Sequence, residues 1–290
     1  MHRPHAEPID GMNELRVAIF GITGRMGRAV AMALAEEAGL RLVGASCSPS
    51  SRSLGCDAGE AMGGSRSNVL VTAQPAAAVE NADVAIDFTL PEATRANLQA
   101  CVARKCALVI GGTGHEEAAR AEIARAAREI PIVMAPNMSL GVNVLLSLVE
   151  RAARALDASY DVEVFEAHHR NKKDSPSGTA LALGRAAANG RGVTLEHAAE
   201  YARHGVTGAR RAGSIGFAVF RGGDVVGDHT VTFAGIGERI ELTHRASDRM
   251  AFAHGAVKAA QWVARRAPGL YSMQDVLGLT HDRNGENGQG

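Results

Sequence analysis

Residues 165–179 read FEAHHRNKKDSPSGT, and this stretch gathers side chains that can exchange protons and bind anions. The adjacent His168 and His169 end a strand-like run, and imidazole can take up or release a proton near neutral pH. Lys172 follows, and its ammonium group can donate a proton or bind an anion. The Ser-Gly-Thr turn then opens a short helix, whose first N–H groups can bind a carboxylate or phosphate. The stretch therefore predicts a site for a small anionic substrate.

The alternative interpretation is a polar loop whose histidines are only solvated, which is the ordinary case for an isolated histidine pair. Histidines, lysines and the Ser-Gly-Thr turn within one short stretch favour a catalytic site instead. In an extended strand His168 and His169 point to opposite faces, so both serve one site only if the strand ends there. The loop-like RNKKD that follows supports such an end, and Lys173 within it is interpreted as a solvated charge.

Composition limits the class of protein. The chain has 290 residues, of which 46% are hydrophobic, enough for two globular domains. Lysine plus arginine and aspartate plus glutamate both number 31, and this zero net charge argues against a nucleic-acid partner. No apolar run approaches the roughly 20 residues of a membrane span, so no membrane partner is expected.

The ends of the chain and the cysteines suggest a location. The first 14 residues lack the apolar segment of a signal peptide, and they and the polar tail NGENGQG are expected to be disordered. The four cysteines, at positions 47, 56, 101 and 106, form no CxxC pair. We therefore expect reduced thiols and a cytoplasmic protein.

A glycine loop near the start of the chain predicts a dinucleotide site. Residues 15–20 form a short apolar run typical of a buried strand, and GITGRMG follows at 21–27. An Ala-rich segment to about residue 38 predicts a helix, and residues 40–45 a second strand. The spacing is GxxGxxG rather than GxGxxG, and a glycine triplet alone could be an ordinary turn. Its place between a strand and a helix favours binding of a cofactor diphosphate.

Strand and helix patterns continue to alternate up to residue 138. Residues 84–88, 107–110 and 131–134 are predicted strands, and Thr89 and Thr113 each precede a glutamate at capping-box spacing. The loops after these strands meet at the carboxyl edge of a parallel sheet, where such sheets bind ligands. The fold class is thus α/β, with a Rossmann-type dinucleotide-binding domain.

Residues after 138 have a different pattern, which predicts a second, α+β domain for substrate binding and oligomerisation. A helix is expected first, then the strand that leads into the histidines, then a loop at 189–212. Three long strands follow, with hairpin turns at Gly222-Gly223 and at 235–237. The predicted segments are a helix at 139–156, strands at 160–168, 213–221, 225–233 and 238–244, and a helix at 248–266.

The motifs VAIFGITGRMGR, DFT, GGTG, APNMSLGVNVL, EAHHRNKKDSPSGTALALG and RGGDVVGDHTVTFAGIGERIELTHRASDRMAFAHGA occur in this order. Together they resemble the 4-hydroxy-tetrahydrodipicolinate reductase (dihydrodipicolinate reductase) family, over residues 15–279. The EAHH…PSGTA block is far more specific than the glycine loop. The resemblance implies a dinucleotide-binding domain of residues 1–138 plus 249–290, completed by the C-terminal helix, and a substrate-binding and tetramerisation domain of residues 139–248.

The resemblance also implies the reaction, which is reduction of a cyclic dicarboxylate by NADPH or NADH in the diaminopimelate route to lysine, in a homotetramer. It implies acid–base catalysis by His168 and Lys172, and substrate contacts from His169, Gly178 and Thr179. It implies that the cofactor is held by Gly21, Ile22, Thr23, Gly24, Arg25, Met26, Gly111, Gly112, Thr113, Ala135, Pro136, Asn137 and Met138.

Two positions depart from the expected pattern. The acidic residue that binds the adenosine ribose should fall about 20 residues after the glycine loop, and Cys47 stands there, followed by Ser48. Without that carboxylate, and with Ser48, Ser50 and Arg52 able to contact a 2′-phosphate, we expect NADPH to be used at least as well as NADH. Gly112 stands where many members of the family carry threonine.

Two other functions remain open. One is a related dehydrogenase of another small anionic substrate, such as a semialdehyde or amino acid, although no cysteine lies in residues 139–248 to act as a nucleophile. The other is a metal-binding or redox-sensing module without turnover, with His168, His169, His229 and His244 as conceivable zinc ligands. Their spacing is not a zinc signature, so we expect no metal.

Overall fold

The computed structural model describes residues 14–280, and these form two compact units. The first contains the chain up to Met138 together with Met250–Val276, and the second contains Ser139–Arg249 and the residues from Leu277 onward. Residues 277–280 thus group with the second unit, whereas the sequence placed them in the first. The expected disorder of the leader and of the NGENGQG tail falls outside the described residues.

The first unit contains a seven-stranded parallel sheet in the order β12-β6-β5-β4-β1-β2-β3. The order of six of these strands, 6-5-4-1-2-3, is that of a doubly wound dinucleotide-binding fold. The strands are β1 (Leu15–Phe20), β2 (Leu40–Ser46), β3 (Val71–Thr72), β4 (Val84–Asp87), β5 (Ala107–Ile110), β6 (Pro131–Met134) and β12 (Gly269–Tyr271).

The strands of this sheet are buried on both faces, which is why they read as continuous apolar runs rather than alternating ones. Every residue of β4 and β5 is buried, and so are the last four residues of β1. The helices of the unit are α1 (Arg25–Glu36), α2 (Ala58–Ala61), α3 (Pro75–Ala78), α4 (Pro91–Arg104), α5 (Glu117–Ala126), α9 (Met250–Val263) and α10 (Met273–Val276).

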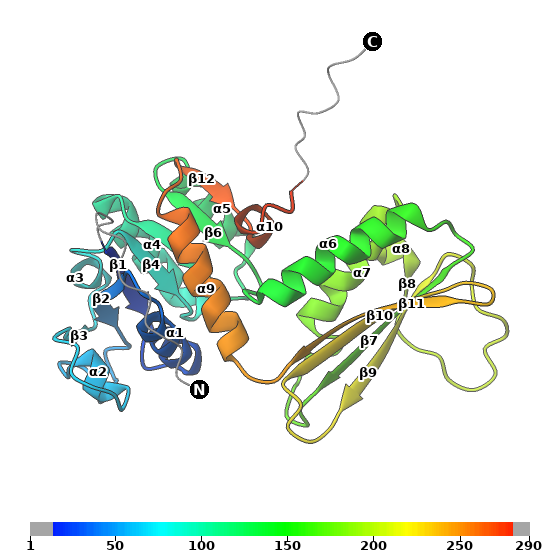
Figure 1. Cartoon of the computed structure of the whole chain (residues 1–290), viewed down its shortest axis with the longest axis horizontal. Coiled ribbons are helices and arrows are strands. Elements are labelled where there is room, and N and C mark those ends of the chain that lie inside the picture. Colours follow the sequence, from blue (N-terminus) through cyan, green and yellow to red (C-terminus); the bar gives the residue numbers. More distant parts are fainter. Residues whose placement is uncertain (1–13, 281–290) are drawn as a thin grey trace, which may run out of the picture. The chain divides into compact units, whose positions relative to one another are not determined.

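The helix α9, drawn in orange in Figure 1, packs against α1 and the central strands of this sheet although it follows the second unit in sequence. Small residues on its inner side, including Ala253, Ala256 and Ala260, are fully buried and allow this close approach. It begins two residues later and ends three residues earlier than the predicted span of 248–266.

The second unit is built on a five-stranded mixed sheet in the order β11-β10-β7-β9-β8. The strands are β7 (Asp161–His168), β8 (Ala199–Glu200), β9 (Ile215–Arg221), β10 (Gly227–Ala234) and β11 (Arg239–Ala246). The helices are α6 (Leu140–Ala155), α7 (Gly178–Gly190) and α8 (Leu195–Ala198), so α8 and β8 occupy part of the predicted 189–212 loop.

The predicted hairpin at Gly222-Gly223 is wrong, because β9 and β10 are not neighbours. The central strand β7 lies between them, parallel to β9 and antiparallel to β10. The glycine pair instead binds the end of β7: the Gly222 N–H donates to the carbonyl of His168 at 3.0 Å, and the Arg170 N–H donates to that of Gly223 at 3.2 Å. The other predicted hairpin joins β10 and β11, which are antiparallel.

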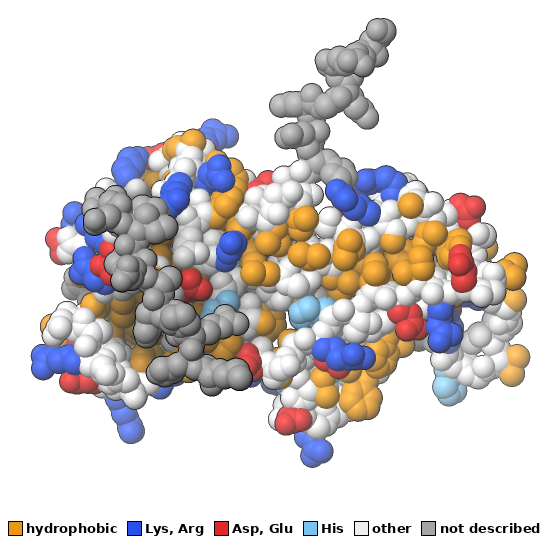
Figure 2. Space-filling model, viewed as in Figure 1, with side chains coloured by type: hydrophobic (Ala, Val, Ile, Leu, Met, Phe, Trp, Pro, Cys, Tyr) orange, Lys and Arg blue, Asp and Glu red, His pale blue; other side chains and the backbone are white. Residues whose placement is uncertain are grey.

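Helices α6 and α7 pack against each other and cover one face of the five-stranded sheet. The core between them contains Val162, Val164, Val231 and Phe233 from the sheet and Leu183 from α7. Figure 2 shows a row of hydrophobic side chains on the surface of the molecule. Among the exposed apolar residues are Val144 and Leu148 of α6, at 38% and 47%.

Both predicted capping boxes are wrong. The residue that caps α4 is Leu90 rather than Thr89, and the one that caps α5 is Glu116 rather than Thr113; neither donates or accepts a side-chain capping bond. The Thr89 side chain is engaged elsewhere, since it donates to Asp87. Within residues 14–280, no helix is long and apolar enough to cross a membrane.

Candidate active site

The glycine loop after β1 has the backbone geometry that a diphosphate site requires. Gly21 has a φ of +71°, a conformation that side chains disfavour. A Cβ on Gly27 would lie 2.2 Å from the carbonyl oxygen of Gly21, so only glycine lets α1 approach the loop. Gly24 caps α1 and supplies no side-chain hydrogen bond, so the first-turn N–H groups of α1 are open to an anion.

The end of β2 lies beside this loop, because the Ile22 N–H donates to the carbonyl of Ser46 at 3.0 Å. Cys47 follows and is buried, with its N–H donating to Thr72. The next side chains, Ser48 and Arg52, are exposed. The acid expected at the ribose position is therefore replaced by a buried thiol, with hydroxyls and one cation on the surface beyond it.

The loop after β4 is held by a buried carboxylate. Asp87, which is 1% exposed, accepts hydrogen bonds from the N–H and hydroxyl of Thr89 at 2.8 and 2.6 Å and from the Asn97 amide at 2.9 Å. The following loops contact this one closely: a Cβ on Gly111 would meet the Phe88 ring at 2.3 Å, and one on Gly112 would meet the Thr89 carbonyl at 2.9 Å. A side chain at position 112 would thus require a shift of the neighbouring loop.

The predicted cofactor residues after β5 and β6 follow strands that end at the same edge of the sheet. Thr113 and Pro136 are exposed, and Asn137 is half-buried. Ala135 and Met138 are buried. The first unit therefore brings the predicted glycine-loop, β5 and β6 residues to one carboxyl edge.

The second unit gathers its predicted catalytic residues around a buried glutamate. Glu166, fully buried, accepts a hydrogen bond from Nδ1 of His168 at 2.5 Å through Oε2. Its Oε1 accepts from the Ser177 N–H at 2.9 Å, and both oxygens accept from Arg221, each at 2.8 Å. Glu166 and His168 share a face of β7 because they are two residues apart, and register pairs His168 with Arg221 of β9.

The ionisation of this cluster follows from its contacts. Burial pushes the pKa of Glu166 up, but hydrogen bonds from Arg221, Ser177 and His168 outweigh it, so the pKa falls below its usual value. Burial lowers the pKa of His168, against the opposing effect of Glu166. At neutral pH the arrangement is therefore a carboxylate beside a largely neutral imidazole.

A second buried histidine, His229 of β10, adjoins the first. Its ring lies edge-on to that of His168, with centroids 5.1 Å apart, and its Nε2 is 3.1 Å from the Ser177 hydroxyl. That hydroxyl also caps α7 by accepting from the Ala180 N–H. Burial lowers the pKa of His229 to about 4, so this ring is neutral over the physiological range.

The remaining predicted residues surround this cluster. The Lys172 ammonium group is ion-paired with Asp174 at 2.9 Å, and the backbone N–H of Lys172 donates to the carbonyl of His169. Gly178 is exposed and begins α7, and a Cβ there would contact nothing within 4 Å. Thr179 is half-buried in the first turn of the same helix. The second unit thus brings His168, Lys172 and the helix turn into one region, with Lys173 exposed beside them.

Glu166 and Arg221 were missed by sequence reasoning, and His229 was considered there only as a conceivable zinc ligand. A glutamate or arginine within a strand ordinarily reads as a solvated residue, and the register that pairs β7 with β9 and β10 was needed to bring the three together. The spacing of Glu166 and His168, which places both on one face of a strand, was the available signal.

The conceivable zinc site is not assembled. Within residues 14–280, no group of three or more histidine, cysteine, aspartate or glutamate side chains is placed to hold a metal ion. His229 and His244 are cross-strand partners, but His244 lies against Gly141 and the Ser139 hydroxyl at the start of α6.

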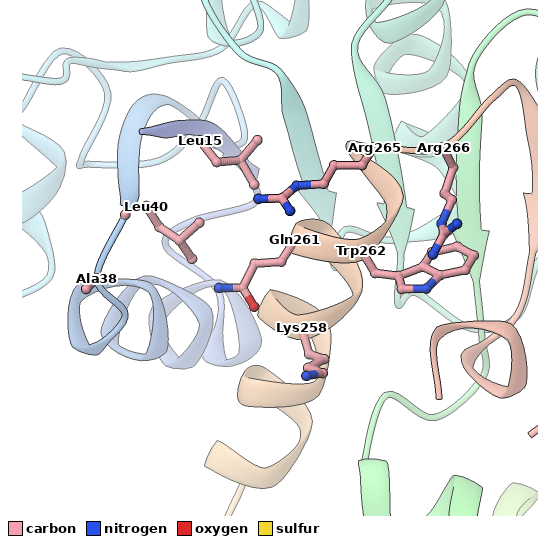
Figure 3. A pocket seen from close by; sticks show the side chains of 9 residues that line it. Leu15, Ala38, Leu40, Lys258, Gln261, Trp262, Arg265 and Arg266 are labelled. Carbon is pink, nitrogen blue, oxygen red and sulfur yellow. The ribbon is translucent and has the colours of Figure 1, made fainter. Parts of the chain in front are cut away.

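A cavity of about 430 Å³ lies at the opposite, amino-terminal edge of the parallel sheet and contains none of the predicted site residues. Figure 3 shows Arg265 and Gln261 extending toward Leu15 and Leu40, where β1 and β2 begin. Arg266 stacks over Trp262 at 4.2 Å.

A Rossmann-type sheet with a glycine loop, and a mixed sheet bearing a buried histidine–glutamate pair, are typical of a two-domain dinucleotide-dependent oxidoreductase. Residues 15–138 match the model of the dihydrodipicolinate reductase N-terminus, and residues 141–277 match that of the dihydrodipicolinate reductase C-terminus. The chain therefore belongs to the dihydrodipicolinate reductase family.

Individual relatives agree with this assignment. The chain is 56% identical over 265 residues to 4-hydroxy-tetrahydrodipicolinate reductase of Thiobacillus denitrificans, covering 91% of this chain and 99% of the relative. It is 57% identical over 264 residues to the reductase of the same name from Alkalilimnicola ehrlichii, with 91% and 99% covered. A dipicolinate-bound dihydrodipicolinate reductase from Paenisporosarcina sp. TG-14 shares the fold, with a TM-score of 0.71 at 24% identity over 90% and 98% of the two chains.

These similarities confirm the predicted family, the α/β fold class with a second mixed-sheet domain, and an NAD(P)H-dependent oxidoreductase of the diaminopimelate route to lysine. They support a nicotinamide dinucleotide as cofactor and a dicarboxylate as substrate. The individual site residues and the choice between NADPH and NADH stay predictions.

Proposed function

We propose that the chain reduces 4-hydroxy-tetrahydrodipicolinate to tetrahydrodipicolinate, with His168 and Lys172 as its acid–base groups and NADPH used at least as well as NADH. The observation that supports this most directly is the buried His168–Glu166 pair bonded to the first residue of the Ser-Gly-Thr turn. Proton transfer and anion binding thus share one rigid cluster. The reaction needs both, because its substrate carries two carboxylates and gains one proton.

The residues at the carboxyl edge of the first unit fit a nicotinamide dinucleotide. The uncapped N-terminus of α1 and the side-chain-free surface of Gly21, Gly24 and Gly27 suit a diphosphate. The cofactor, when bound, supplies a hydride to a ring carbon of the substrate. Exposed Ser48 and Arg52, with no carboxylate between Arg41 and Gly55, suit a 2′-phosphate.

On the second unit, the chain's own residues provide the proton and the substrate's counter-charges. Lys172 is a cation whose ammonium group can donate to the carbon beside the reduced position, and His168 can exchange a proton through Nε2. The first-turn N–H groups of α7, at Gly178 and Thr179, can bind one carboxylate, and His169 can contact it.

We also propose a homotetramer assembled through the five-stranded sheet. Helices α6 and α7 cover only one face of that sheet. On the other face, register pairs Phe165 with Ala218 and Phe220 with Ala167, so the two phenylalanines lie on one face of neighbouring strands, and they are 44% and 48% exposed. Aromatic side chains so exposed on the face of a sheet are typical of a surface that another subunit covers.

The site assignment is tested with His168→Ala and Lys172→Ala, assayed by loss of reduced-nicotinamide absorbance with substrate generated in place. Each should lower kcat by on the order of 100-fold or more, because a general acid or base contributes at least that much. The Kd for NADPH, measured by fluorescence, should not change. Full activity in both variants would refute the assigned roles.

A further inference from the structure

We propose that Glu166 is a positioning residue for this reduction: its buried carboxylate fixes the orientation and tautomer of His168 and joins that histidine to the anion-binding turn through the Ser177 N–H, while Arg221 compensates its charge. Because His168 meets substrate only if the chain is this reductase, the role rests on the proposed function.

The contacts of Glu166 determine which nitrogen of His168 carries the proton. A carboxylate that receives two hydrogen bonds from a guanidinium is ionised and can only accept, so Nδ1 of His168 at 2.5 Å must donate. In the neutral ring, Nε2 therefore presents its lone pair. A Cβ on Gly227 would lie 3.1 Å from that Nε2, so the absence of a side chain at 227 leaves Nε2 unobstructed on this side.

The same carboxylate ties three separate segments together. Its Oε1 accepts from the Ser177 N–H, one residue before α7, so the turn and the histidine are held by one group. Arg221, which bonds both carboxylate oxygens, also donates from its Nη2 to the carbonyl of Asp174 at 2.8 Å. Asp174 in turn pairs with Lys172. Histidine, lysine and anion turn are thus fixed relative to one another through Glu166 and Arg221.

The conservative variant Glu166→Gln keeps the shape of the side chain and removes its charge. We expect kcat to fall on the order of ten- to hundredfold, with an unchanged KM for NADPH, because misoriented acid–base groups lose much of their contribution. Binding of pyridine-2,6-dicarboxylate, measured by calorimetry, should weaken several-fold, because the Ser177 N–H loses its charged acceptor.

A merely structural role would not predict the next result. Because Glu166 raises the pKa of His168, its neutralisation should move the His168 titration to lower pH. The shift to lower pH should appear in the limb of the kcat pH profile that reports His168. It should also appear in the ¹⁵N signals of selectively labelled histidine, with the His168 signal assigned by its absence in His168→Gln. The other charged or titratable groups that face His168 are Lys172, Arg221 and His229.

Glu163→Gln is the matched control. Glu163 lies on the same strand and also binds arginines, Arg203 and Arg210, but it is on the opposite face and has no contact with His168. It should leave the kcat, the pH profile and the histidine signals unchanged. If Glu166→Gln also left the kcat, the pH profile and the histidine signals at their wild-type values, the positioning role would be refuted.

If Glu166→Gln does not fold because the half-buried Arg221 is left without this counter-charge, the double variant Glu166→Gln/Arg221→Gln removes both charges. It should still lower the pKa of His168, and an unchanged titration there would also refute the role. The histidine titration is measured on the protein without substrate. An absence of turnover in the wild type would therefore refute the proposed reduction while the titration still tested Glu166.

Discussion

At the scale of single residues, the chemistry depends on burial as much as on residue type. His168 could be selected from the sequence as an acid–base group, but its neutral state follows from its burial, and its orientation from Glu166. Glu166 was not selected, because only the fold shows that its carboxylate faces the core side of the sheet rather than solvent. A candidate catalytic residue can thus be proposed from its type, whereas its partners are set by register.

Burial of His229 predicts acid sensitivity. Its pKa falls from 6.5 to about 4 on folding, so below pH 6.5 the unfolded chain binds a proton that the folded chain does not. The free energy of unfolding is therefore not reduced by His229 protonation above pH 6.5, and it decreases as the pH falls from 6.5 toward 4. At about 1.4 kcal/mol per pH unit, the loss is on the order of 3 kcal/mol.

Urea unfolding at several pH values checks this expectation. The free energy of unfolding of the wild type should decrease between pH 6.5 and 4, with smaller contributions from His168 and His244, whose pKa values burial also lowers. His229→Gln, which can still bond the Ser177 hydroxyl, should show a shallower decrease. Parallel curves for the two proteins would contradict the assignment to His229.

At the scale of elements, the parallel sheet could be predicted closely because each buried strand is a continuous apolar run bounded by turn residues. The bounds of β1 and β5 agree with the prediction. The mixed sheet could not be predicted as well, because the order of its strands depends on long-range pairing. The glycine pair at 222 and 223 resembles a hairpin turn, yet β7 takes the position between β9 and β10.

The glycine loop yields a prediction at this scale. Gly27→Ala should abolish dinucleotide binding or destabilise the first unit, because its Cβ would lie 2.2 Å from the backbone oxygen of Gly21. NADPH fluorescence and thermal unfolding measure the two effects. Gly64→Ala is the matched control, since its Cβ would meet nothing nearer than 3.6 Å. Normal cofactor affinity and Tm in Gly27→Ala would show that the loop has another conformation.

At the scale of the whole molecule, each unit is proposed to supply one half of the chemistry: a dinucleotide edge in the first and a proton-transfer cluster in the second. The family signature at EAHH…PSGT could be recognised from the sequence because it is local. The uncovered face of the five-stranded sheet could not, because Phe165 and Phe220 are far apart in sequence and share a face only through the pairing of β7 with β9.

That face predicts how the subunits assemble. Phe165→Asp places a charge at the centre of the proposed interface, where it would be desolvated, so it should shift the protein from tetramer to smaller species. Light scattering during size-exclusion chromatography measures the mass. Leu54→Asp, at a residue 44% exposed in the first unit, is the control and should remain tetrameric. If Phe165→Asp still formed a tetramer of unchanged stability, the interface would have to lie elsewhere.

The measurement that tests the central claim most directly is oxidation of reduced nicotinamide in the presence of a synthase that makes the substrate from pyruvate and aspartate semialdehyde. NADPH and NADH are compared side by side. We expect rapid oxidation that requires the synthase, with a kcat/KM for NADPH at least equal to that for NADH, because Cys47 replaces the ribose-binding acid. A tenfold preference for NADH would contradict the cofactor assignment, and no oxidation of either cofactor by folded protein would contradict the proposed reduction.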